Sequence, residues 1–160
     1  MTSETKISVR QTDPQTIAFI SGKGPYSQIP EAMGKLFGWI GQKGYIPAGP
    51  PSGVYFNSPM EVAEEELLWE IRCPVSAETP SSEPDARGFG VKKQPSAQVA
   101  TAIHKGPFHE VGRTYGAIMA WMNENGYQIA GPPKEIYLSD PSSTPPEELL
   151  TEIWIPVRKG

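Results

Sequence analysis

The sequence repeats itself without a gap at an offset of 82 residues, which carries Gly24 onto Gly106. The shared positions are mostly turn-forming, aromatic or acidic. They include Pro25 and Pro107, Tyr26 and Phe108, Trp39 and Trp121, Gly44 and Gly126, Tyr55 and Tyr137, and Glu70 and Glu152. Two halves that share only composition would not match so closely at one offset. We therefore predict a single 1–160 domain made of a first repeat (1–75), a Ser-, Pro-, Glu- and Gly-rich linker (76–90) and a second repeat (91–160).

Each copy has the pattern of a strand, a helix and two further strands. In the first copy we expect strands at 16–21, 54–56 and 66–73, with Gly44 capping the helix between the first two. The predicted helical faces are Ile29, Met33, Leu36, Phe37 and Ile40 in the first copy, and Val111, Tyr115, Ile118, Met119 and Met122 in the second. The second copy begins with a strand at 98–104. The pattern predicts an α+β fold in which the two copies complete one sheet and bury their helices on one face of it. The other face of the sheet is then where we expect the functional site.

Composition and charge exclude several classes of protein. Of the 160 residues, 38% are hydrophobic and 20% charged, which is typical of a globular chain. The net charge is −4, and Lys and Arg are scattered, so we expect no direct nucleic-acid partner. The sequence has no apolar run long enough for a membrane span, and residues 1–10 lack a secretory signal, so we expect a cytoplasmic protein. The one cysteine, Cys73, excludes an internal disulfide and is predicted to be an inert buried thiol.

The last strand of each copy carries the most informative side chains. Side chains alternate along a strand, so Glu152 and Trp154 share one face while Ile153 and its apolar neighbours share the other. In the first copy Arg72 takes the place of Trp154, which gives Glu70 a cationic neighbour. We therefore predict that Glu152 is an unpaired carboxylate that a ligand satisfies. The alternative is a glutamate on an edge strand that points into water.

Other aromatic residues are candidates for the same concave surface. The predicted ligand-binding set is Glu152, Trp154, Tyr137, Tyr55, Glu70, Trp69, Tyr26 and Phe108. Trp39 and Trp121 lie beside the apolar helical stripes and are predicted to pack in the core. His104 and His109 have no partner cluster of Cys or Asp, so we predict no metal and no cofactor. We expect His104 to hydrogen-bond the backbone of the turn that follows it.

Two segments that recur in both copies resemble a known family. The segments GPPSGVYFNSP and LLWEIRCPV, repeated as GPPKEIYLSDP and LLTEIWIPV, look like the GyrI-like domains, also known as bacterial regulator effector-binding domains. The resemblance implies that the two fused copies form a curved antiparallel sheet with helices on one face and a ligand groove on the other. The groove runs along a pseudo-twofold axis and binds lipophilic, often cationic, small molecules between aromatic walls. It also implies a buried glutamate in the last strand, which maps onto Glu152. Many relatives carry a DNA-binding region before this domain, and we expect the stand-alone form here.

The resemblance leaves three functions open. The first is a small-molecule binder that acts as a sensor or sequesters its ligand. The second is a hydrolase that opens cyclopropane rings of DNA-alkylating compounds, with Glu152 or Glu70 as general acid or base. The third is a protein-interaction module that resembles topoisomerase inhibitors. The sequence does not indicate an oligomeric state.

Overall fold

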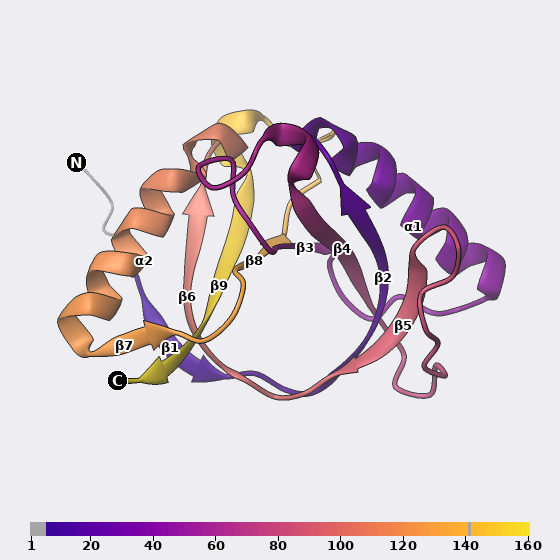
Figure 1. Ribbon diagram of the computed structural model, residues 1–160, viewed down its shortest axis with the longest axis horizontal. Coiled ribbons are helices and arrows are strands. Elements are labelled where there is room, and N and C mark those ends of the chain that lie inside the picture. The colour runs from indigo at the N-terminus through magenta and orange to yellow at the C-terminus, as the bar shows by residue number, and fades with distance from the viewer. Residues whose placement is uncertain (1–5, 141) are drawn as a thin grey trace. The chain divides into compact units, whose positions relative to one another are not determined.

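The computed structural model describes residues 6–140 and 142–160. Contacts divide the chain into two compact units, each with one long helix and an antiparallel sheet (Figure 1). We call Asp13–Ser96 the first-copy unit. The second-copy unit combines 97–160 with the chain before Asp13, of which 6–12 are described. Each unit is therefore built around one copy of the repeat.

The first-copy unit has four strands in the order β3-β4-β2-β5. Its elements are β2 (Gln15–Lys23), α1 (Ile29–Lys43), β3 (Ser52–Tyr55), β4 (Leu68–Val75) and β5 (Phe89–Gln94). The helix α1 packs on β2 and β4 and ends at Gly44, whose φ of 72° is a left-handed conformation that favours glycine. Pro30 lies in the first turn of the helix, where a missing backbone N–H costs nothing.

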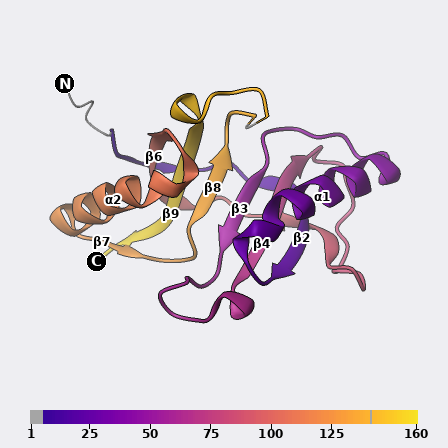
Figure 2. The same ribbon diagram turned by 90° about the horizontal axis from the view of Figure 1, so that it is seen from above.

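The second-copy unit has its strands in the order β1-β6-β9-β8, with the short β7 paired to β9. Its elements are β1 (Ser8–Gln11), β6 (Gln98–Lys105), α2 (Val111–Asn125), β7 (Tyr127–Ile129), β8 (Lys134–Tyr137) and β9 (Leu150–Lys159). The helix α2 packs on β6 and β7, and Figure 2 shows each helix running along its own sheet. Gly126 caps α2 as Gly44 caps α1.

The strand registers confirm the duplication. Ile17 pairs with Pro74 in the first-copy unit, and the positions 82 residues later, Val99 and Pro156, pair in the second. Both helices also span equivalent residues, 29–43 and 111–125. The α+β fold of duplicated antiparallel units is thus confirmed.

The strand that stands directly before each copy in the sequence joins the sheet of the other copy. The strand β1 pairs with β6 of the second copy, and its equivalent β5 pairs with β2 of the first. These two strands were not predicted, and each extends a three-stranded sheet to four. As a result β5 begins within the predicted linker, at Phe89.

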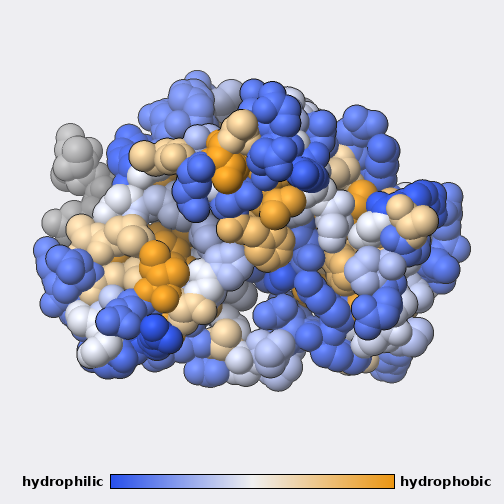
Figure 3. All heavy atoms as spheres, in the orientation of Figure 1, coloured by the Kyte–Doolittle hydropathy of each residue, from blue (hydrophilic) through white to orange (hydrophobic). Residues whose placement is uncertain are grey.

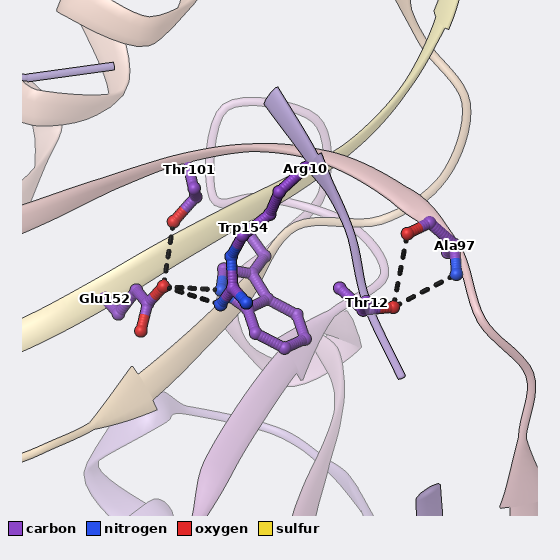
Figure 4. Close-up of polar contacts among 6 residues, drawn as sticks. All are labelled: Arg10, Thr12, Ala97, Thr101, Glu152 and Trp154. Atoms are coloured by element: carbon purple, nitrogen blue, oxygen red, sulfur yellow. Dashed lines mark hydrogen bonds and ion pairs between the residues drawn. The ribbon is translucent and has the colours of Figure 1, made fainter. Parts of the chain in front are cut away.

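Three hydrogen bonds between Thr12 and Ala97 hold the end of β1. The Thr12 backbone N–H donates to the carbonyl oxygen of Ala97 (2.8 Å), and the Ala97 N–H donates to the Thr12 hydroxyl (3.0 Å). The hydroxyl in turn donates to the same carbonyl oxygen at 3.2 Å (Figure 4). We call this pair the Thr12 clamp.

The cores lie between each helix and its sheet. In the first-copy unit Leu36, Trp39 and Ile40 of α1 pack against Ile71 and its neighbours, as predicted for Trp39. In the second, Ile118 and Met122 of α2 pack against Ile153, Ile155 and Val157. The predicted helical faces were wrong at one position each. Phe37 and Met119 are exposed. The buried face of α1 includes Trp39 in place of Phe37, and the buried face of α2 includes Thr114.

The side of each sheet away from its helix carries Glu70 or Glu152, and we call it the glutamate face. Strand alternation places Glu152 and Trp154 there, because Ile153 and Ile155 belong to the core beneath α2. Hydrophilic residues cover most of the surface seen in Figure 3, with small apolar groups between them. Among the described residues, no helix has the length and apolar character that a membrane span requires.

Candidate functional site

Glu152 lies at the centre of a polar cluster on the glutamate face of the second-copy unit. Its Oε2 accepts hydrogen bonds from Arg10 Nη2 (3.0 Å), Thr101 Oγ1 (3.0 Å) and Trp154 Nε1 (2.9 Å) (Figure 4). The three donors come from β1, β6 and β9, which are neighbours in the sheet. The Glu152 side chain keeps 19% of its surface exposed, so the carboxylate remains accessible.

Two cations lie over the indole ring of Trp154. The guanidinium carbon of Arg10 is 5.0 Å from the ring centroid, and Lys134 Nζ is 4.9 Å from it. Arg10 reaches the ring from β1 and Lys134 from β8, so the two come from opposite sides of β9. Both distances are typical of cation–π attraction. The indole of Trp154 therefore already binds cations of the protein itself.

The prediction that Glu152 lacks a cationic partner was wrong. The distance between Arg10 Nη2 and Glu152 Oε2 is that of an ion pair, and the Arg10 side chain is 48% exposed. The sequence analysis missed Arg10 because β1 was not assigned as a strand and pairs with the copy that is distant in sequence. The repeat contained a signal, since the offset of 82 residues carries Arg10 onto Lys92, so a basic residue precedes both copies.

Glu70 has a different environment in the first-copy unit. Its Oε1 accepts hydrogen bonds from Arg72 Nε (2.6 Å) and Lys92 Nζ (2.8 Å). Glu70 and Arg72 are nearly buried, with 7% and 10% of their side chains exposed. Lys92 also lies over the ring of Phe19, at 4.5 Å from its centroid. The cationic neighbour predicted for Glu70 is thus Arg72, with Lys92 as a second cation, and the place of Glu70 in the ligand-binding set stays a prediction.

The remaining predicted aromatic residues lie on the helix side of the sheets. Tyr26 and Tyr55 form an edge-to-face pair at 5.3 Å, packed against the core beneath α1. Phe108 and Tyr137 form the equivalent pair at 5.7 Å in the second-copy unit. Tyr55 lies on the opposite side of its own sheet from Glu70, and Tyr137 lies on the opposite side of its own sheet from Glu152, because side chains alternate along β3 and β8. That all these rings line one concavity stays a prediction.

Trp69 is buried in the core of the first-copy unit. It is 3% exposed, and its Nε1 donates a hydrogen bond to the Gly24 carbonyl oxygen at 3.0 Å. His104 has the predicted backbone role in the second copy. Its Nε2 donates to the Pro107 carbonyl oxygen (3.0 Å), which leaves Nδ1 to accept from the Thr114 hydroxyl (2.8 Å).

Glu135 is a carboxylate that the sequence analysis did not select. It lies in β8 on the helix side, and the Tyr115 hydroxyl of α2 donates a hydrogen bond to it at 2.8 Å. Burial raises the pKa of Glu135 above its ordinary value, and the Tyr115 hydrogen bond opposes part of that rise. Its equivalent in the first copy is Gly53, so the two copies differ in charge here.

Other features of the described residues offer less to a ligand. Burial raises the pKa of the Cys73 thiol to about 11, as expected for an inert cysteine. No group of three His, Cys, Asp or Glu side chains in the described part of the chain could hold a metal ion. A cavity of about 490 Å³ in the first-copy unit is lined by Pro14, Pro74, Lys93 and neighbouring residues, and it contains none of the predicted site residues.

Comparisons with solved structures agree with this fold. The chain matches the C-terminal domain of EcmrR with a TM-score of 0.77 and 22% identity, covering 98% of this chain and 99% of that domain. In an EcmrR–DNA complex the TM-score is 0.82 at 18% identity, and the match spans 98% of this chain but only 58% of the EcmrR chain. SAV2435, solved bound to tetraphenylphosphonium, matches with a TM-score of 0.56 and 14% identity over 96% of this chain and 94% of that one.

Sequence comparisons identify the family. A protein named DNA gyrase inhibitor from Serratia proteamaculans (strain 568) is 25% identical over 159 residues, which is 96% of this chain and 99% of that protein. The model of the GyrI-like small molecule binding domain matches residues 5–158, nearly the whole chain. The chain therefore belongs to the family of GyrI-like small molecule binding domains.

Proposed function

We propose that this protein binds lipophilic small molecules, cations among them, on the glutamate face of its second-copy unit. The observation that carries the proposal is the pairing of an accessible carboxylate, Glu152, with the indole of Trp154 two residues along the same strand. A carboxylate attracts a cation, and an aromatic face attracts both a cation and a flat apolar group. These are the two contacts that a lipophilic cation needs.

The asymmetry between the copies supports one site rather than two. Glu70 is nearly buried between Arg72 and Lys92, and it lacks an indole at the position of Trp154. A ligand at Glu70 would have to separate a buried ion pair, which is costly. The predicted groove between the copies stays a prediction, since all the contacts that carry the proposal lie within the second-copy unit.

The other two functions stay predictions from the family resemblance. A hydrolase needs a carboxylate that exchanges a proton with its substrate, and both Glu70 and Glu152 are already ion-paired with protein cations. The name of the Serratia relative favours a gyrase partner for that relative. Binding of a small molecule is the function to which the Glu152 cluster contributes most directly.

Titration with ethidium, a planar lipophilic cation, tests the proposal. We expect Glu152→Gln to weaken ethidium binding by about tenfold, because loss of one charge interaction is worth about 1.4 kcal/mol at a partly buried site. The measurement is ethidium fluorescence against protein concentration. Glu148→Gln is the matched control, since it removes an exposed carboxylate from the same unit and should leave affinity unchanged. Equal affinity of wild type and Glu152→Gln would remove Glu152 from the site.

A further inference from the structure

Arg10 makes both of the contacts that the proposed function assigns to a ligand. Its guanidinium is ion-paired with Glu152 at 3.0 Å and lies 5.0 Å from the centroid of the Trp154 ring. Arg10 thus occupies both groups of the proposed site, while Lys134 Nζ also lies over the Trp154 ring, at 4.9 Å from its centroid. A ligand cation cannot occupy the same space as Arg10, so it has to displace the Arg10 side chain.

We infer that Arg10 is a tethered competitor that occupies the cation position of the Glu152–Trp154 site and sets its affinity for cationic ligands. The inference rests on the proposed function and adds a specificity-determining residue to it. Binding exchanges one cation for another on the same carboxylate and ring. Arg10 therefore selects for ligands whose apolar surface adds contacts that a guanidinium does not make.

The displaced side chain has a low-cost alternative. Nearly half of the Arg10 side-chain surface is already exposed, and β1 lies at the end of the strand order, so the side chain already borders on water before a ligand arrives. Exposed ion pairs and exposed cation–π contacts are individually weak. The energy that holds Arg10 in place is thus within the range that a small ligand can supply.

The backbone of β1 stays in place during this exchange. Two residues beyond Arg10, the Thr12 clamp ties the strand to Ala97 by three hydrogen bonds of 2.8–3.2 Å. Four residue pairs with β6, from Ser8–Thr101 to Gln11–Gln98, hold the rest of the strand. The movement is therefore a side-chain rotation and not detachment of the strand.

Glu152 keeps two neutral donors after Arg10 leaves. The Thr101 hydroxyl and the Trp154 indole N–H still orient Oε2, but neither balances its charge. A carboxylate that is held in place and has lost its ion-pair partner attracts the incoming cation. In the first copy the same step is blocked, because removing Lys92 leaves Glu70 paired with the nearly buried Arg72.

Ethidium titration of Arg10→Gln tests the inference. We expect affinity to rise by about three- to tenfold, the combined loss of one exposed ion pair and one cation–π contact. Lys92→Gln removes the same charge from the equivalent position of the first copy and should leave affinity unchanged. Repeating both titrations at high salt separates displacement from long-range attraction, because salt screens the latter. The rise for Arg10→Gln should persist there.

The outcomes separate this inference from the proposed function. If Glu152→Gln weakens binding and Arg10→Gln leaves it unchanged or weaker, Arg10 is not a competitor, although the site stands. If Glu152→Gln has no effect, the site itself is wrong. A direct readout is the NMR signal of the Arg10 guanidinium in wild-type protein. Saturation with ethidium should speed its hydrogen exchange while the β1 amides stay protected, and an unchanged guanidinium signal would contradict displacement.

Discussion

At the scale of single residues, the two copies fill the same space with different side chains. In the first copy the indole of Trp69 lies against Gly22, where a Cβ atom would overlap the ring. In the second copy the equivalent positions are Thr151 and His104, so the large side chain has moved to the opposite strand. In each copy the ring of the large side chain donates an N–H to a backbone carbonyl oxygen in the turn after the first strand of that copy. Trp69 donates to Gly24, and His104 donates to Pro107. A large ring beside a small residue therefore fills the same place in both sheets, with the ring on β4 in the first copy and on β6 in the second.

This packing predicts a large difference between two glycine substitutions. Gly22→Ala should lower the free energy of unfolding by about 1–3 kcal/mol, because the new methyl group overlaps Trp69. Gly38→Ala, in α1, meets no atom within 4 Å and should raise stability by about 0.5–1 kcal/mol, since alanine favours a helix. Urea unfolding of both variants is the measurement. Equal stability of the two would show that Trp69 does not require a glycine opposite it.

At the scale of elements, short strands decide how the sheets are completed. β1 and β5 have four and six residues, and each pairs with a strand of the other copy in the sequence. Periodicity within a copy predicts the helices and the longer strands, because those patterns are local. It cannot predict which distant strand will accept a short edge segment. For this reason the periodicity predicts neither β1 nor β5, and it does not predict the contact of Arg10 in β1 with Glu152.

The Thr12 clamp is the contact that fixes β1 as an element. Thr12→Val removes the hydroxyl that both accepts from and donates to Ala97, while keeping the side-chain volume. We expect a loss of about 1–2 kcal/mol in stability and faster hydrogen exchange of the β1 amides. Thr12→Ser, which keeps the hydroxyl, should behave like wild type. Unchanged exchange in the valine variant would mean that pairing with β6 alone holds the strand.

At the scale of the whole molecule, the duplication and the α+β architecture were predictable from one sequence. The shared turns, the caps at Gly44 and Gly126 and the face shared by Glu152 and Trp154 all follow from local patterns. The surroundings of Glu152 do not, because Arg10, Thr101 and Lys134 come from three other strands. Alternation along β3 and β8 places Tyr55 and Tyr137 on the helix side of their own sheets, and the shared ligand surface predicted for the aromatic set stays a prediction.

The dependence of overall stability on pH should reveal Glu135. Its raised pKa means that the folded protein binds a proton more readily than the unfolded chain, so this group stabilises the fold less as pH rises through that pKa. Glu135→Gln should therefore be more stable than wild type at neutral pH, by about 1 kcal/mol. The difference should disappear toward the ordinary pKa of 4.5. Thermal unfolding across this range is the measurement, and a difference that does not change with pH would contradict the assignment.

The exchange of β1 and β5 puts the order of the gene out of phase with the order of the folded units. One unit is continuous as Asp13–Ser96, whereas the other joins the last 64 residues, Ala97–Gly160, to the beginning of the chain. The order of the strands resembles that of a circular permutant, because β1 stands before the first-copy unit in the sequence and not after β9, the last strand of the unit to which it belongs. A recombination event at the boundary of the sequence repeat would separate each sheet from its fourth strand. Intact modules would instead be inherited from crossovers at Thr12 and Ser96, the two places where the chain passes between units.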